Sequence, residues 1–204
     1  MALLYIMLRS KSKDTSHCRL NAWRGDLRVD ITEDEWEKTC LKAQTQTINT
    51  ALKLLQYKWL FRTYVTPVKL NRFNPDIPDN CPKCNVYAGT LLHCMWECPK
   101  IQLFWKNTVN LFSRIAAIEV PLEAKFCILA IYPNHFVPSR KTAPLINLCM
   151  LQARRVIALR WKNMDSPTTA MWLRNLASCL ALEKLTYVVR GKNSKFKEIW
   201  DTFY

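Results

Sequence analysis

Residues 81–98 read CPKCNVYAGTLLHCMWEC: a Cys-x-x-Cys pair at Cys81 and Cys84, eight further residues, His93, four more residues and Cys98. Three thiols and an imidazole form a set that tetrahedral Zn²⁺ prefers, and four protein ligands leave no position open for a reactive water. The spacing therefore predicts a structural zinc site at Cys81, Cys84, His93 and Cys98. Gly89, in the spacer, is the residue best suited to a turn with positive φ. Zinc binding at such a site contributes on the order of 10–16 kcal/mol of coupled folding free energy.

The identity of one ligand stays open at this level. On an ideal helix the side chains of His93 and Cys98 point about 140° apart, whereas Cys94 and Cys98 share a face. Either the helix loosens before Pro99, or Cys94 replaces His93 as a ligand. Buried cysteines also serve as small apolar core residues, and this chain has nine cysteines. The close grouping of four ligand-type residues favours a metal site over core packing alone.

Length and composition indicate a folded, helical and basic protein. The chain has 204 residues, half of them hydrophobic, and eight tryptophans, which argues against general disorder. Only three glycines are present, which disfavours a β-rich fold with many tight turns. The formal net charge of +14 favours a polyanionic partner, nucleic acid rather than a membrane surface. The apolar start at residues 1–8 is too short to span a bilayer and lacks the features of an export signal. We therefore expect reduced cysteines and a nuclear or cytoplasmic location.

Apolar residues recur with helical spacing along most of the chain. They predict a mainly α fold, in which helical bundle segments surround a small Cys-Cys-His-Cys zinc module. Thr32 and Glu35 form a capping-box pattern at the start of one helix, and the next begins near residue 47 and ends before Pro67. Pro99 opens another helix, one more covers about 143–162, and Ser166 is expected to cap the helix that follows.

The composition divides the chain into three parts: an N-terminal helical region at 1–75, a cysteine-rich zinc module at 76–100 and a C-terminal helical domain at 101–204. Residues 71–80 have the composition of a linker. Residues 9–30 are polar and mixed in charge; Trp23 and Leu27 are spaced to dock one helical face, and we expect a loop over the rest of this stretch. Trp96 and Trp105 are expected to pack the zinc module on the following helix rather than to stack on bases.

Two long stretches contain basic residues without a carboxylate. Residues 38–75 hold seven basic side chains and no acidic one, and residues 124–164 hold seven more. A helix surface that faces solvent usually carries both acidic and basic side chains. A long run of basic side chains alone therefore favours contacts with phosphates, and aromatic side chains in these stretches are available to stack on bases. A solubilising surface is the alternative. The predicted nucleic-acid-binding residues are Lys53, Lys58, Arg62, Lys69, Arg72, Arg154, Arg155, Arg160 and Lys162.

Several of these segments resemble a known family. Trp36, LQYK at 55–58, RTYVTP at 62–67 and the 81–98 cluster are similar to the C-terminal part of LINE-type reverse transcriptases, the non-LTR retrotransposon proteins. The most specific part is GTLLHCMWEC at 89–98, followed by FW at 104–105. Residues 23–27, ARRVI at 153–157, WK at 161–162 and LEKLTY at 182–187 also resemble that family, particularly its vertebrate members, so the resemblance covers most of the chain.

The resemblance implies the end of a thumb region followed by a cysteine-rich tail. It implies that Cys81, Cys84, His93 and Cys98 occupy the family's Cys-Cys-His-Cys positions, and that the tail binds nucleic acid, chiefly template RNA. The first spacer is longer than in a retroviral zinc knuckle, so the compact knuckle fold is not implied.

The catalytic residues of that family are missing. A polymerase needs paired aspartates to hold two metal ions on the incoming triphosphate, and no Tyr-x-Asp-Asp motif occurs; helix capping explains the acidic cluster at 33–37. We therefore expect no enzyme activity and no small-molecule substrate, but a non-catalytic segment that binds nucleic acid, with RNA favoured. The alternative is a zinc-stabilised helical scaffold that docks protein, for instance the polymerase body, through the apolar residues at 3–8.

Overall fold

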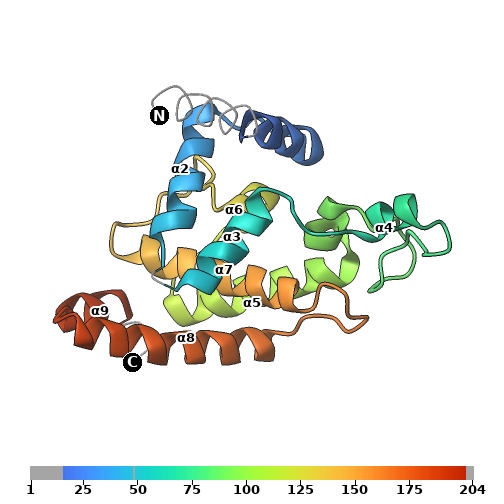
Figure 1. Ribbon diagram of the computed structural model, residues 1–204. Coiled ribbons are helices and arrows are strands. Elements are labelled where there is room, and N and C mark those ends of the chain that lie inside the picture. The colour runs from blue at the N-terminus through green and yellow to red at the C-terminus, as the bar shows by residue number, and fades with distance from the viewer. Residues whose placement is uncertain (1–15, 48, 201–204) are drawn as a thin grey trace, which may run out of the picture. The chain divides into compact units, whose positions relative to one another are not determined.

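The computed structural model describes residues 16–47 and 49–200, without the side chains of residues 195 and 199, and this part of the chain is helical (Figure 1). Within these residues no strand is present, and extended backbone pairs in one isolated bridge, between Asn80 and Ala88. The mainly α prediction is confirmed. The chain divides into two compact units, residues 1–64 and residues 65–204. The apolar segment at 3–8 lies outside the described residues.

Among its described residues, the first unit contains three helices: residues 16–27, α2 (Glu33–Thr45) and α3 (Thr50–Leu60). The helix at 16–27 includes the helical face predicted at Trp23 and Leu27, but it starts earlier than expected, so the loop predicted for the rest of this stretch is wrong there. Leu20 and Trp23 bury one side of that helix while its polar residues face outward. The indole nitrogen of Trp23 donates a 2.9 Å hydrogen bond to the carbonyl of Leu60, at the end of α3. This bond satisfies a carbonyl that the helix end leaves without an intrahelical partner.

The helix ends in the first unit follow from capping side chains. The capping box at α2 is confirmed: Glu35 N donates to Thr32 Oγ1 at 3.2 Å, and Thr32 N donates to the Glu35 carboxylate at 2.9 Å. α3 begins at Thr50 rather than near residue 47, because Asn49 accepts hydrogen bonds from the first amides of that helix. It ends at Leu60, and Arg62 adopts a left-handed backbone with φ of 59°.

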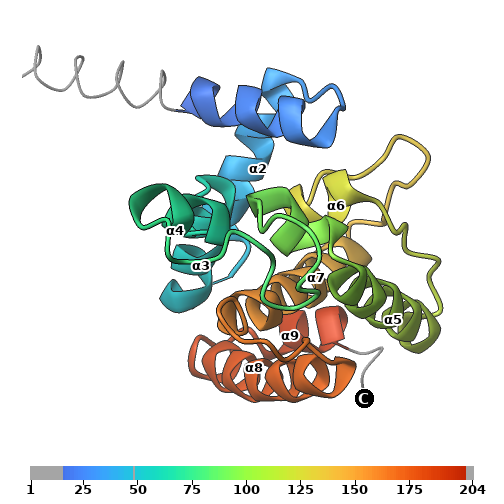
Figure 2. The same cartoon turned by 90° about the vertical axis from the view of Figure 1, so that its right-hand side faces the viewer.

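The second unit is built around α7 (Thr142–Leu159), which is buried around most of its circumference and packs against α5, α6, α8 and α9 (Figure 2). α9 folds back along α8, as Figure 1 shows. No helix in the described part of the chain combines the length and apolar character that a bilayer crossing requires. The other elements of this unit are α4 (Pro67–Phe73), the π-helical turn η1 (His93–Glu97), α5 (Pro99–Ala116), α6 (Ala124–Leu129), α8 (Thr169–Val189) and α9 (Asn193–Trp200).

Several predicted boundaries shift in this unit. α7 ends at Leu159 rather than 162, and α8 begins at Thr169 with Thr168, not Ser166, as its cap. Thr168 Oγ1 accepts a 3.3 Å bond from the amide of Met171. The expected linker at 71–80 is helical through residue 73, where α4 ends.

Trp105 confirms the predicted packing of the cysteine-rich segment on α5. Its ring is fully buried, and its indole nitrogen donates a 3.0 Å bond to the carbonyl of Met95 in η1. The centroid of the Trp96 ring lies 6.4 Å from that of Trp105. The segment is therefore fixed to α5 by an aromatic contact and by a buried hydrogen bond.

Candidate functional site

The loop that carries Cys81 and Cys84 is closed by its own backbone. The amide of Asn85 donates a 2.8 Å bond to the carbonyl of Cys81, and the amide of Cys81 donates a 2.7 Å bond to the carbonyl of Tyr87. Asn85 takes the left-handed conformation, with φ of 56°. Asparagine tolerates that conformation better than most residues do. These contacts hold the two thiols on one side of a tight turn.

Gly89 is needed in this loop for a different reason from the one predicted. The positive-φ turn expected there is wrong, since the left-handed residue of the loop is Asn85. A Cβ atom on Gly89 would lie 2.6–2.9 Å from ring carbons of Pro67, the first residue of α4. The absence of a side chain lets α4 pack directly on the metal loop.

A π-helical turn brings His93 and Cys98 to the same side. The amide of Cys98 donates a 2.9 Å hydrogen bond to the carbonyl of His93, five residues earlier, where an α-helix would bond four residues earlier. The wider turn reduces the angle between the two side chains. Of the two possibilities left open above, the helix loosens before Pro99.

The side chains of Cys81, Cys84, His93 and Cys98 converge in a cluster suited to metal binding, in which all four ligand atoms lie within 4.8 Å of one another. Cys81 Sγ lies 3.9 Å from Cys98 Sγ, and Cys84 Sγ lies 3.3 Å from His93 Nε2. Around a tetrahedral ion with metal–sulfur bonds of about 2.3 Å and metal–nitrogen bonds of about 2.0 Å, these separations are about 3.8 Å and 3.5 Å. The observed arrangement fits such an ion.

Cys94 lies beside this set as a buried thiol. A hydrogen bond between the Cys94 and Cys81 side chains lowers the pKa of the Cys81 thiol to about 4 and raises the pKa of the Cys94 thiol. Cys94 is therefore the donor in this bond. Burial raises the pKa of Cys98 to about 11, while the backbone amides of residues 100 and 101 act in the opposite direction. A neighbouring donor therefore stabilises Cys81 in the thiolate form that metal ligation requires.

Lys83, between the first two cysteines, joins the metal loop to the end of α7. Its side chain is 4% exposed, and Nζ donates to the carbonyl of Arg160 at 2.9 Å. The carbonyls of Trp161 and Asn163 lie 3.4 Å from the same nitrogen. Burial lowers the pKa of Lys83, and the charges of nearby thiols oppose that effect. Lys83 thus binds the turn that directly follows α7 and places a positive charge beside the cysteines.

Arg154 is the clearest failure among the predicted nucleic-acid-binding residues. It is 1% exposed, and its Nη1 donates to the carbonyls of Cys127 and Ile128, at 3.3 Å and 3.2 Å, near the end of α6. Burial lowers the pKa of Arg154 to about 10. A guanidinium in this position stabilises a helix end inside the second unit and does not reach a phosphate strand.

Two further predicted arginines are engaged in ion pairs. Arg62 Nη2 lies 2.5 Å from the Asp26 carboxylate, and its guanidinium sits 4.5 Å from the ring centroid of Trp23. Its side chain is 15% exposed, so it mainly stabilises the first unit. Arg160 Nη1 lies 3.6 Å from the Asp165 carboxylate at a more exposed position.

The remaining predicted basic residues stay accessible, although they belong to two different units. In the first unit Lys53 is half-buried and Lys58 is exposed, both on α3. In the second unit Lys69 and Arg72 are exposed on α4, Arg155 is half-buried on α7, and Lys162 is exposed beyond its end. Comparison with models of known protein families gives no match to this chain.

Proposed function

We propose that this chain is a non-catalytic segment that binds nucleic acid, with RNA favoured, and that Zn²⁺ at Cys81, Cys84, His93 and Cys98 holds its second unit together. Thiolate and imidazole ligands match the softness of zinc, and a closed set of four is typical of a structural site. We propose further, from the resemblance of its motifs, that the chain is the C-terminal segment of a LINE-type reverse transcriptase. The missing polymerase aspartates favour binding without catalysis.

Unpaired basic side chains support nucleic acid as the partner. Within the described residues, ion pairs engage the side chains of Arg62 and Arg160. Lys58, Arg72 and Lys162 are exposed and form no ion pair with any described residue. Together with the net charge of +14, these side chains favour association with a phosphate strand. The observation that carries the proposal is this excess of exposed, unpaired positive charge.

Binding of the full chain to single-stranded RNA across a salt series tests the proposal. We expect the logarithm of the binding constant to fall linearly with that of the salt concentration, by about 0.7 for each phosphate contact. Replacing Lys53 and Lys58 by glutamine should make the slope shallower and leave the helix content unchanged. Lys106→Gln removes an exposed charge outside the predicted set and serves as the control. A slope near zero for the natural chain would exclude phosphate-driven binding.

A zinc-stabilised scaffold that docks protein is the second candidate, favoured by one face of α8. Leu182, Leu185 and Val189 are 59%, 61% and 77% exposed and follow one another at helical spacing. Exposed apolar residues in a row are typical of an interaction surface. Sedimentation analysis distinguishes this candidate: self-association that disappears in the Leu182→Gln, Leu185→Gln double variant would favour it, and a monomeric natural chain would not.

A further inference from the structure

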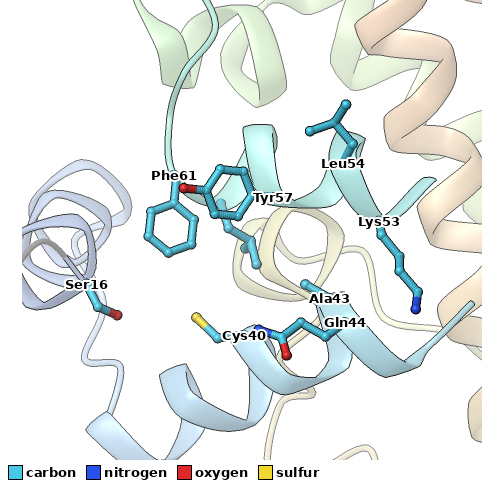
Figure 3. A pocket seen from close by; sticks show the side chains of 9 residues that line it. Ser16, Cys40, Ala43, Gln44, Lys53, Leu54, Tyr57 and Phe61 are labelled. Atoms are coloured by element: carbon cyan, nitrogen blue, oxygen red, sulfur yellow. The ribbon is translucent and has the colours of Figure 1, made fainter. Parts of the chain in front are cut away.

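The first unit contains a groove that the metal centre does not use. It encloses about 750 Å³ between the helix at 16–27, α2 and α3 (Figure 3). This volume falls in the range of about 300–1,000 Å³ that is usual for ligand sites. Six of its lining side chains bear on what it can bind: Ser16, Cys40, Gln44, Lys53, Tyr57 and Phe61.

An aromatic pair forms one wall of the groove. The rings of Tyr57 on α3 and of Phe61, the residue directly after α3, are one turn apart and stacked, with centroids 4.5 Å apart and an angle of 22° between their planes. Figure 3 shows the two rings on one side and Cys40 with Gln44 on the other. Tyr57 is 53% exposed, although the other face of α3 is buried through Leu52 and Trp59. Tyr57 therefore offers a planar surface that the core of the unit does not occupy.

The polar groups in the groove are neutral or positive. Lys53 lies one turn before Tyr57 on α3, and Gln44 supplies an amide from α2; no carboxylate is among the lining residues. Cys40 is a neutral thiol, since burial first and the charge of Glu37 second raise its pKa to about 11. These groups match a ligand that combines a flat ring with an anion. The aromatic wall suits the face of the ring, the amide of Gln44 can donate to or accept from its polar edge, and the ammonium group of Lys53 suits the anion.

We propose that this groove takes one unpaired base of single-stranded RNA, stacked on Tyr57, with an adjacent phosphate on Lys53. The inference rests on the proposed function and adds to it a recognition site for the base itself. Stacking is sequence-tolerant, because every base has an aromatic face, so the groove gives preference for unpaired strands rather than for a sequence. Gln44 contacts the edge of the base from the opposite wall.

The test compares two labelled strands of equal length by fluorescence anisotropy: a single-stranded RNA and a sugar–phosphate strand without bases. Tyr57→Ala should weaken binding of the RNA by about fivefold or more and leave binding of the base-free strand unchanged. Tyr57→Phe should keep the natural affinity for both. Lys53→Gln should weaken both, because it removes a phosphate contact. Leu41→Ala, an exposed position on α2 outside the groove, is the control and should change neither.

The outcomes separate the two proposals. If the natural chain binds neither strand, the proposed function fails. If it binds RNA and Tyr57→Ala binds equally well, the function stands and the groove assignment is overturned. Should Tyr57→Ala lose helix content by circular dichroism, the comparison moves to Tyr57→Leu and Tyr57→Phe, which both retain apolar bulk; equal RNA affinity of those two variants would overturn the assignment.

Discussion

Replacing Lys83 by methionine should destabilise the second unit by about 2 kcal/mol, near the middle of the 1.5–3 kcal/mol that hydrogen bonds to charged groups contribute. Methionine keeps most of the apolar stem but removes the ammonium group. Of the three carbonyls near Nζ, only that of Arg160 is at a short distance, 2.9 Å, and the two at 3.4 Å contribute less. The expected loss therefore corresponds to one strong charge-assisted bond.

Urea unfolding of the zinc-loaded protein measures this change. Zinc release, followed with a chromogenic chelator, reports on the unit that contains Lys83, and circular dichroism reports on the whole chain. The slope of free energy against urea should stay the same while the midpoint falls. Lys106→Met removes an exposed lysine on α5 and should change stability by less than about 0.5 kcal/mol. Equal midpoints for the Lys83 and Lys106 variants would refute the role assigned to Lys83.

Three further predictions follow from buried contacts. Gly89→Ala should lower the free energy of unfolding by about 1–3 kcal/mol, because the new Cβ overlaps the neighbouring proline ring. Gly25→Ala is the control and should not lower it, because no atom lies within 4 Å of its new Cβ. Thermal unfolding of the two variants checks this prediction. Cys98→Ala should abolish stoichiometric zinc binding while Cys94→Ala retains it, as measured by mass spectrometry under native conditions; the reverse result would make Cys94 the ligand. Arg154→Met should lower the thermal midpoint and leave the salt dependence of RNA binding unchanged, and a shallower salt slope would return Arg154 to the binding surface.

Local sequence spacing was enough to predict that Cys81, Cys84, His93 and Cys98 come together in one cluster, because all four lie within one short segment. The spacing could not decide whether His93 or Cys94 joins the cluster. The answer depends on whether the amide of Cys98 bonds to the carbonyl four or five residues earlier, and the structure shows five. The bond that selects the π-turn forms inside a segment held on α5 by Trp105, a tertiary contact.

Charge alone predicted the basic residues less well, because it does not reveal burial. Arg154 and Arg155 are adjacent and chemically identical, yet Arg154 is 1% exposed while Arg155 is half-buried. The role of Lys83 was equally hidden, since its strongest acceptor is the carbonyl of Arg160, 77 residues further along the chain. A lysine between two cysteines carries no signal for that distant partner.

Removal of the metal tests the central claim most directly. The natural chain, purified without added metal, should contain one zinc ion, and a strong chelator should remove it with a loss of helix signal in circular dichroism that restored zinc reverses. A chain that carries no zinc as purified, and whose spectrum and thermal midpoint stay the same in chelator, would contradict the account.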